Sequence, residues 1–580
     1  MIKKLAKSIR QYKKASILSP IFMVLEVLME VLIPFLMADL VDIGIDGGNM
    51  GYVVKMSTVL FTAALLSLGF GVLSGNFSAI ASAGFAGNLR HDIYASVQRF
   101  SFSNTDKFSS ASLITRLTTD VTNVQNAYQM IIRQAVRAPV MMILALSMSF
   151  SVNAQISLIF LAIIPILGVG LFYLYTSVHP TFKRAFKKYD RLNGLVQENL
   201  HGIRVVKSYV REETENGKFK VISNDIYADF MKAQKKVVLN APLMQLCVNA
   251  CMLLVAWVGA KLIVGGSMST GELMSVIAYV MQILMSLNLL SLVFVMIMIS
   301  RASAERIVEV LEEEADLKNP EHPIQMVKDG GIVFKNVNFS YVNDTDKLCL
   351  KDVNLTILAG ETVGIIGGTG SSKTSLIQLI PRLYEVTTGS VTIGGENVKN
   401  YDIPSLRNEV AVVLQKNLLF SGTIKENLRW GNADADDAEL RRVCRLAQAD
   451  GFIQEFPKGY DTYIEQGGTN VSGGQKQRLC IARALLKKPK ILILDDSTSA
   501  VDTKTDAFIR KAFREEIPNT TKLIIAQRIS SVQDADKIVV LDGGSINAVG
   551  THSELLASNR IYQEVYHSQI QGGGDFDAEK

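Results

Sequence analysis

Several uncharged apolar stretches in the first half of the chain are long enough to cross a membrane, and they limit its fold more than any other feature. A spanning helix needs about 20 apolar residues in sequence. Six spans are predicted, at about residues 15–40, 56–82, 130–152, 155–178, 239–263 and 273–299. Hydrophobic residues make up 48% of the chain and gather in this half. The pattern predicts an all-α, six-helix transmembrane domain over residues 15–308, with long helical extensions between the spans.

Basic residues lie at only one end of these spans. Lysine or arginine occupies positions 3, 4, 7, 10, 13 and 14 before the first span, and positions 183, 184, 187, 188 and 191 after the fourth. The loops at the opposite ends, residues 42–52, 151–155 and 264–271, contain neither. Because cytoplasmic loops are enriched in Lys and Arg, the pattern predicts a multi-pass protein of the cell membrane whose C-terminal half is cytoplasmic. Residues 1–14 are predicted to form a helix on the membrane surface.

A glycine-rich loop is the first candidate functional motif in the second half of the chain. The strand-like run ETVGII at residues 361–366 leads into GGTGSSKT and then into the helical pattern SLIQLI. The loop residues are Gly367, Gly368, Thr369, Gly370, Ser371, Ser372, Lys373 and Thr374. Strand, loop and helix in this order predict a P-loop: backbone N–H groups face phosphates, Lys373 reaches the outer phosphates, and Thr374 ligates Mg²⁺. ATP and Mg²⁺ are therefore the expected cofactors.

One P-loop position departs from the pattern. Ser372 stands where the motif has its second glycine. A serine there is tolerable at negative φ and costly at positive φ.

A fully apolar run at residues 491–494 delivers two carboxylates, Asp495 and Asp496, at its C-terminal end. Such a run is typical of a strand buried on both faces, and ligands of open α/β sheets bind at that end. Asp495 is predicted to hold Mg²⁺ through water. Upstream, the segment VSGGQ (Val471, Ser472, Gly473, Gly474 and Gln475) opens another helix and forms a second anion-binding terminus. Residues 330–568 are therefore predicted to be an α/β P-loop ATPase domain.

The P-loop, VSGGQ and ILILDD together resemble the ABC transporter family, and the resemblance covers the whole chain. It implies that Tyr341 stacks on adenine and that Gln415 ligates Mg²⁺ and senses the membrane domain. VSGGQ would be the signature that contacts a partner's ATP. The loop Ser499, Ala500, Val501 and Asp502 would contact the other ATPase domain. The segments 113–125 and 198–213 resemble the exporters' intracellular loops, whose short transverse helices dock on the ATPase domains, and the fused domain order favours export.

Two positions depart from the family pattern. Asp496 replaces a glutamate that orients or deprotonates the attacking water, and its side chain is one methylene shorter. A displacement of about 1 Å can cost roughly 10²-fold in rate. Gln527 replaces the switch histidine, and an amide donates a hydrogen bond but takes up no proton. At this chain's own site we therefore expect ATP binding to survive and turnover to be weak.

The intact signature predicts that this chain completes the consensus ATP site of a different partner. That division resembles heterodimeric bacterial multidrug exporters, so the chain is interpreted as half of an exporter of amphipathic or hydrophobic compounds, with hydrolysis mainly at the partner's P-loop. One alternative is a slow homodimeric lipid or peptide exporter in which Asp496 is a weak base. Another is an ATP-gated channel or regulatory subunit. The net charge of +5 lies mostly in loops at the membrane surface and does not indicate nucleic-acid binding.

Two carboxylates, Glu26 and Glu30, lie one helical turn apart inside the first span. Carboxylates at membrane depth are costly and usually face a cavity or a partner. They either bind cationic substrates in a cavity, or lie in a wet vestibule or pair with Arg133 or Arg137 for structural reasons. Residues 309–329 are predicted as a linker and residues 569–580 as a disordered tail.

Overall fold

The computed structural model describes residues 1–497 and 501–571. The chain forms two compact units, one of Met1–Gln98 with Ser110–Glu313 and one of Arg99–Ser109 with Glu314–Lys580. The short segment Arg99–Ser109 interrupts the helical half in sequence but packs with the C-terminal unit.

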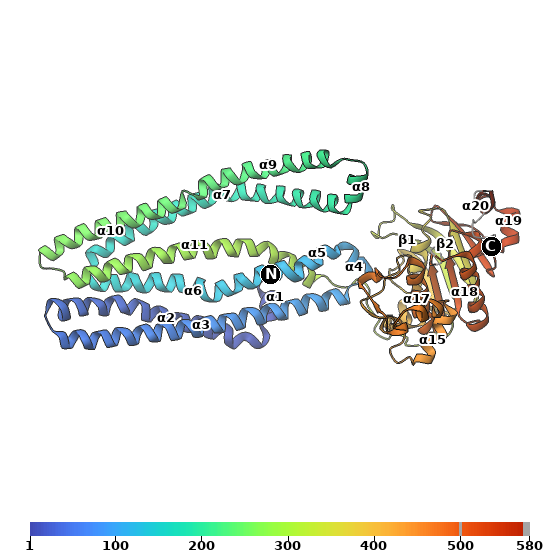
Figure 1. The fold of residues 1–580 in the computed structure, drawn as a ribbon, viewed down its shortest axis with the longest axis horizontal. Helices are drawn as coiled ribbons and strands as arrows, with labels where there is room; N and C mark the ends of the chain where they lie inside the picture. The colour runs from blue at the N-terminus through green and yellow to red at the C-terminus, as the bar shows by residue number, and fades with distance from the viewer. Residues whose placement is uncertain (498–500, 572–580) are drawn as a thin grey trace. The chain divides into compact units, whose positions relative to one another are not determined.

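Long helices make up the first unit (Figure 1). Their bounds are α1 (Ile2–Ala6), a 3₁₀ helix (Lys7–Tyr12), α2 (Lys13–Asp39), a π-helical segment (Leu40–Asp46), α3 (Met50–Arg99), α5 (Ser110–Thr115), a π-helical turn (Arg116–Asp120), α6 (Val121–Val152), α7 (Ala154–His201), α8 (Ile203–Ser208), α9 (Glu212–Val237), α10 (Asn240–Val264) and α11 (Thr270–Glu312). The α7 helix runs beside α9 and α10, while α2, α6 and α11 pack together.

Five helical stretches among the described residues are long and apolar enough to cross a membrane. They are 2–46, 50–99, 110–152, 212–264 and 270–312. Five of the predicted spans fall on them. The span predicted at 155–178 falls on α7, where the apolar stretch found, Ala154–Gly170, is shorter. The sixth span stays a prediction.

Two ion pairs join the α5–α6 junction to the end of α11. Arg116 Nη2 donates to Glu309 Oε2 at 2.8 Å, and Arg306 Nε donates to Asp120 Oδ2 at 2.8 Å. Asp120 is fully buried. Since buried charges are tolerated when paired and hydrogen-bonded, these contacts fix the register between the two helical segments.

Two main sheets form the C-terminal unit. The strands are β1 (Ile332–Phe339), β2 (Leu350–Ile357), β3 (Thr362–Gly367), β4 (Thr388–Ile393), β5 (Glu396–Asn397), β6 (Val410–Val413), β9 (Ile491–Asp495), β10 (Thr521–Ile525), β11 (Lys537–Asp542) and β12 (Ser545–Gly550), with a small pair, β7 (Gly422–Thr423) and β8 (Tyr463–Ile464). The antiparallel sheet has the order β2-β1-β4-β5, and the larger sheet has the order β12-β11-β3-β10-β9-β6. In the larger sheet only β12 runs antiparallel to its neighbour.

The helices of this unit are mostly short. They are α4 (Phe102–Lys107), α12 (Lys373–Gln378), α13 (Ile403–Glu409), α14 (Ile424–Leu428), α15 (Asp437–Leu446), α16 (Asp450–Glu455), α17 (Gly473–Leu486), α18 (Thr503–Glu516), α19 (His552–Ser558) and α20 (Arg560–Gln571). The fold is thus a helical transmembrane domain followed by a domain with mixed sheets.

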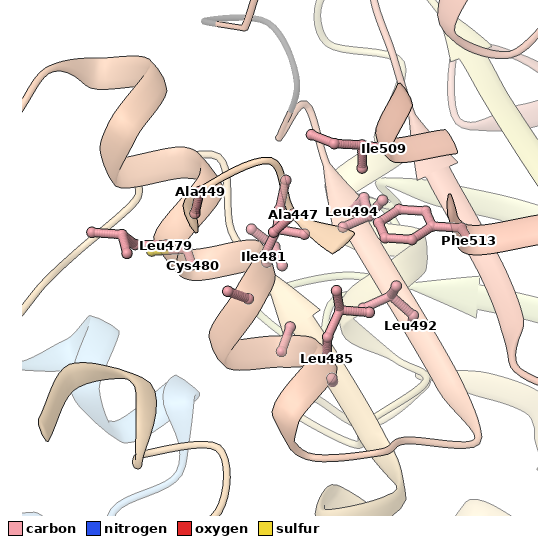
Figure 2. Close-up of a cluster of buried hydrophobic side chains, with 14 of the residues drawn as sticks. Ala447, Ala449, Leu479, Cys480, Ile481, Leu485, Leu492, Leu494, Ile509 and Phe513 are labelled. Carbon is pink, nitrogen blue, oxygen red and sulfur yellow. The ribbon is translucent and has the colours of Figure 1, made fainter. Parts of the chain in front are cut away.

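A buried apolar cluster ties α17 to the strand that carries the paired carboxylates (Figure 2). Leu479 and Leu485 of α17 belong to one core with Leu494 of β9 and with Ile509 and Phe513 of α18. All five are less than 5% exposed. Because close-packed cores resist displacement, the helix that follows VSGGQ and the strand that ends at Asp495 form one stiff body.

The predicted boundaries differ from the helix ends by a few residues. The α11 helix runs to Glu312, inside the predicted linker, and β1 begins at Ile332. The α20 helix ends at Gln571, so residues 569–571 of the predicted tail are helical, and residues 572–580 lie outside the described residues. At the start of the chain, α2 begins at Lys13, within the segment predicted as 1–14.

Candidate nucleotide site

The predicted nucleotide-binding residues follow four strands that lie side by side. The strands β3, β10, β9 and β6 are neighbours in this order and run parallel. The P-loop follows β3, Gln527 follows β10, the carboxylate pair ends β9, and Gln415 follows β6. Parallel strands end at the same edge of a sheet, which is where ligands of such sheets bind. The larger sheet thus brings together residues that are up to 160 positions apart, from Gly367 to Gln527.

The P-loop wraps around its own lysine. Lys373 Nζ donates to the carbonyl oxygens of Gly367, at 2.7 Å, and Gly368, at 2.9 Å. Burial lowers the pKa of Lys373. A Cβ at Gly367 would lie 2.3 Å from the carbonyl oxygen of Leu541, so only glycine fits there. The loop therefore has the geometry of a phosphate cradle that keeps its lysine close to the backbone.

Ser372 adopts the costly conformation. Its φ is +67° and its ψ is 26°, which lies in the left-handed region. For a residue other than glycine this region costs roughly 1–2 kcal/mol. The serine at the second-glycine position is therefore strained, and α12 begins directly after it.

Two oxygen donors that suit Mg²⁺ meet at the end of β9. Thr374 Oγ1 donates to Asp495 Oδ2 at 3.0 Å. Asp495 is 3% exposed, and burial raises its pKa. Across residues 1–497 and 501–571 no group of three or more His, Cys, Asp or Glu side chains could hold a metal ion. A hydroxyl and a carboxylate fit Mg²⁺, which takes its remaining ligands from phosphates and water.

Asp496 and Gln527 contact each other directly. Gln527 Nε2 donates to Asp496 Oδ2 at 2.7 Å. Burial raises the pKa of Asp496, while hydrogen bonds from Gln527 and Gln415 act in the opposite direction. Asp496 has a φ of +48°, a conformation that aspartate tolerates better than most residues. The geometry thus holds a short carboxylate against an amide that takes up no proton.

Sequence reasoning missed Gln477, which holds the main chain of Asp496. Its side chain is 1% exposed, and Nε2 donates to the main-chain oxygen of Asp496 at 3.3 Å. The only signal in the sequence is a polar residue two positions after VSGGQ that lies one helical turn before the apolar Cys480 and Ile481.

Tyr341 is held by the helix that follows the P-loop. Its hydroxyl lies 2.9 Å from Ser375 Oγ and donates to Gln378 Oε1 at 3.1 Å. The side chain is 43% exposed, and burial of the hydroxyl raises its pKa. An exposed ring anchored at one end is suited to stack on a planar base.

A second tyrosine connects Tyr341 to α4. The Tyr384 ring packs edge-on against Tyr341, with centroids 5.1 Å apart, and its hydroxyl donates to Asp106 Oδ2 at 2.6 Å. Phe102 also packs edge-on against Tyr384, with centroids 6.0 Å apart. Burial and this hydrogen bond raise the pKa of Tyr384.

A segment that sequence reasoning did not single out packs with the C-terminal unit. It is α4, within Arg99–Ser109. Residues 113–125 lie in α5, the π-helical turn and α6 of the first unit, and their docking on an ATPase domain stays a prediction. The start of α4 is recognisable in the sequence, because Ser101 and Asn104 form a capping box at its N-terminus.

The signature opens α17 with a complete capping box. Ser472 Oγ accepts from Gln475 N at 3.2 Å, and Gln475 Oε1 accepts from Ser472 N at 2.9 Å. Val471 is buried in the core beneath, so the Gly473–Gly474 backbone is held at the start of a 14-residue helix. In the following loop, Val501 is buried and Asp502 caps α18 through Thr505 N at 2.9 Å. Ser499 and Ala500 lie outside the described residues.

In the first unit, Glu26 and Glu30 share one guanidinium. Arg137 Nη1 donates to Glu26 Oε1 at 2.6 Å, and Nη2 donates to Glu30 Oε2 at 2.7 Å. Both carboxylates also line an open cavity between α2, α3 and α6, together with Arg133. The structure thus contains both features that the sequence offered as alternatives, a cavity and an ion pair with Arg137.

Comparison with known proteins agrees with this architecture. Residues 16–287 match the family model described as ABC transporter transmembrane region, and residues 350–499 match the model described as ABC transporter. The chain is 37% identical to the uncharacterized ABC transporter ATP-binding protein YfiB of Bacillus subtilis (strain 168), over 97% of each chain. It is 36% identical to YheI of the same organism, a probable multidrug resistance ABC transporter ATP-binding/permease protein, over 74% of this chain and 73% of that protein. The fold resembles a solved bacterial Atm1-family ABC exporter with ATP bound, with a TM-score of 0.82 and 23% identity over 97% of this chain and 99% of that one.

Proposed function

The chain belongs to the ABC transporter family, and we propose that it is one half of an ATP-driven exporter whose own ATP site turns over weakly. The P-loop and signature keep the residues that bind nucleotide, so ATP and Mg²⁺ bind at both ATP sites. Hydrolysis takes place mainly at the P-loop of a different partner subunit, whose nucleotide contacts the signature of this chain.

The contact between Asp496 and Gln527 carries this proposal. Water attack on the terminal phosphate needs a positioned base and a group that can exchange a proton. Asp496 is too short to reach the usual position of the base, and its carboxylate is hydrogen-bonded to the Gln527 amide at 2.7 Å. The capping box at Ser472, by contrast, keeps the backbone donors of the signature in order. One site is therefore weakened while the contribution to the other is preserved.

The cargo is an amphipathic or hydrophobic compound that passes through the helical unit of the cell membrane. ATP binding draws the two ATPase domains together and turns the cavity outward, and hydrolysis at the partner's site resets it. The weak site holds its ATP for longer and keeps the domains in contact. The multidrug description of YheI, the open cavity beside Glu26 and Glu30, and the apolar residues around it support this class of cargo.

The composition of the native complex tests the proposal. The chain is tagged in its own cell, extracted in mild detergent and weighed as an intact complex by mass spectrometry. We expect a second, different ABC half with glutamate and histidine at the two degenerate positions. A pure homodimer would overturn the heterodimer and leave Asp496 and Gln527 as a slow but self-sufficient pair.

Transport is tested separately, in inside-out vesicles that contain the native complex. ATP should drive uptake of an amphipathic dye, and the same complex in a planar bilayer should carry no ion current. ATP-dependent current without uptake would favour a channel over an exporter.

A further inference from the structure

The main chain leaves the larger sheet just before Gln527. Ala526 N still donates to the carbonyl oxygen of Ile365 in β3, at 3.3 Å, but the pairing of β10 with its neighbours ends at Ile525. The next regular turn is a 3₁₀ helix at Ile529–Ser531. Loop segments are more mobile than the elements that they connect. The position of the Gln527 backbone therefore depends on contacts from outside the sheet.

Gln569, near the end of α20, holds this backbone through both ends of its side-chain amide. Its Nε2 donates to the carbonyl oxygen of Gln527 at 2.7 Å, and its Oε1 accepts from Ile529 N at 2.9 Å. The two main-chain groups lie on either side of Arg528, so one amide pairs with an acceptor and a donor two residues apart, as a neighbouring strand does. The side chain of Gln569 thus continues the hydrogen bonding of the sheet beyond its end.

An apolar face keeps α20 in place. With the spacing i, i+3, i+4 and i+7, one face of this helix consists of Tyr562, Val565, Tyr566 and Gln569. Tyr562 is fully buried, and Val565 and Tyr566 pack against the same core. Ile529, whose N–H donates to Gln569, belongs to that core as well. Packing therefore brings the Gln569 amide to the loop after β10, although the sequence placed residue 569 in the predicted tail.

The residue that is held lies at the edge of the sheet where the terminal phosphate of ATP is expected. Gln527 Nε2 donates to Asp496 Oδ2 at 2.7 Å, and the preceding Asp495 accepts from Thr374 of the P-loop at 3.0 Å. A side-chain amide has two N–H donors, so one remains available to a phosphate oxygen. Hydrogen bonds to charged acceptors are strong. Because ADP lacks the terminal phosphate, a donor fixed at this edge favours ATP over ADP.

We infer that Gln569 is a positioning residue of this chain's nucleotide site: it holds the main chain around Arg528, keeps the Gln527 amide near the terminal phosphate, and so favours ATP over ADP. This role rests on the proposed binding of ATP at the P-loop of this chain. Gln569 acts only through Gln527, so its effect should disappear when residue 527 can no longer donate.

The test measures how well AMP-PNP and ADP compete with 8-azido-ATP for photolabelling of this chain in the native complex. AMP-PNP keeps the terminal phosphate and resists hydrolysis, and the azide on adenine labels the chain that contacts the base. Gln569→Ala should weaken AMP-PNP by about 3- to 10-fold and leave ADP unchanged, because part of a charge-assisted hydrogen bond is lost. Gln527→Ala should weaken AMP-PNP by about 10-fold or more. The double variant should equal Gln527→Ala alone.

Gln563→Ala is the matched control, because Gln563 is another glutamine of α20 that donates to a main-chain oxygen, that of Leu556, at 2.8 Å. It should leave the ratio of AMP-PNP affinity to ADP affinity unchanged. Gln569→Glu is a second variant of nearly the same shape. It can still accept from Ile529 N but cannot donate to Gln527, so it should lower the ratio as well.

An unchanged ratio in Gln569→Ala or in Gln527→Ala would overturn the inference. So would an equal loss for both nucleotides, losses that add up in the double variant, or the same change of ratio in Gln563→Ala. Each of these results leaves ATP binding by this chain, and with it the proposed function, intact. If 8-azido-ATP does not label this chain at all, the proposed nucleotide binding is wrong and the inference fails with it.

Discussion

At the residue scale, the nucleotide site combines groups placed to bind nucleotide with two side chains that we propose weaken catalysis, and with one strained loop residue. Lys373, Thr374 and Asp495 have the contacts expected of phosphate and Mg²⁺ ligands. Asp496 and Gln527 are hydrogen-bonded to each other, and Ser372 has a positive φ. Each departure concerns a single side chain, so each can be reversed by a single substitution.

Replacing Ser372 by glycine should stabilise the C-terminal unit. The left-handed conformation costs serine roughly 1–2 kcal/mol in the folded state. Because glycine has more conformational freedom in the unfolded chain, about 0.5–1 kcal/mol of the relieved strain is offset. A net gain of about 0.5–1 kcal/mol should raise the Tm by about 2 °C, as measured by scanning fluorimetry. Ser371→Gly is the control, since Ser371 is not among the residues with positive φ. An equal rise in both variants would contradict the strain at Ser372.

Restoring both catalytic positions should activate this chain's own site. In Asp496→Glu with Gln527→His, the carboxylate gains reach and the imidazole can take up a proton. Hydrolysis by a complex whose partner carries an inactive P-loop should rise by about 10²-fold, as measured by phosphate release. Adding Lys373→Ala to the double variant should abolish the gain. A double variant as slow as the wild type would show that these positions do not limit the rate.

At the element scale, contacts between helices determine what the site and the membrane unit can do. The α4 helix contacts Tyr384, which packs on Tyr341. Only the ring of Tyr384 would therefore lie between α4 and the tyrosine predicted to stack on adenine. In the first unit, Arg137 of α6 holds two carboxylates of α2. Each contact joins elements more than 100 residues apart.

Tyr384→Phe should weaken the link between α4 and the nucleotide site without removing the ring. ATP affinity should be unchanged, because the edge-on packing on Tyr341 remains, while stimulation of hydrolysis by cargo should fall. The measurement compares nucleotide binding with ATP hydrolysis at saturating dye. Tyr401→Phe, which loses a buried hydrogen bond to the Ile393 carbonyl in the same unit, controls for general destabilisation. Equal stimulation in Tyr384→Phe and the wild type would argue against the link.

Arg137→Gln should destabilise the packing of α2 on α6. The guanidinium is 25% exposed, and the carboxylates of Glu26 and Glu30 are 11% and 27% exposed, so its removal leaves two largely buried charges without a partner. We expect a loss of about 2–3 kcal/mol, less than for a fully buried pair. Glu26→Gln with Glu30→Gln in the same chain should recover part of the loss, as measured by thermal unfolding in detergent. No recovery would mean that the charges are not the cause.

At the scale of the whole molecule, the proposed exporter gives the two ATP-binding surfaces of this chain to different sites. In that proposal the P-loop belongs to the weak site, while VSGGQ at the start of α17 serves the partner's nucleotide. The apolar core of Figure 2 joins that helix to β9, which ends at Asp495. Loss of the P-loop and loss of VSGGQ should therefore have different effects on ATP hydrolysis by the complex.

Variants of the signature should be more harmful than variants of the P-loop in the same chain. Gly473→Asp places a negative charge where the partner's phosphates bind and should lower hydrolysis by the native complex by about 10²-fold or more. Lys373→Ala should reduce it only modestly, because the site that it weakens contributes little. Steady-state phosphate release at saturating ATP measures both. Similar losses in the two variants would indicate two equivalent sites.

The sequence alone was sufficient for the features that depend on a few neighbouring residues. Apolar stretches predict helices that cross a membrane because lipid solvates only apolar side chains, and five of them match helices of sufficient length and hydropathy. The P-loop, the strand before Asp495 and the capped helix of the signature are equally local, since each is a short run with its own turn or capping chemistry.

Only the tertiary structure decided which distant residues meet. Asp106 and Tyr384 are 278 positions apart, and no sequence motif predicts that they are in contact. Arg133 and Arg137 are equivalent in spacing and charge, yet packing of α2 on α6 pairs Arg137 with both glutamates and leaves Arg133 facing the cavity. The physical reason is that pairing depends on the register between helices, which is determined by the close packing of many side chains.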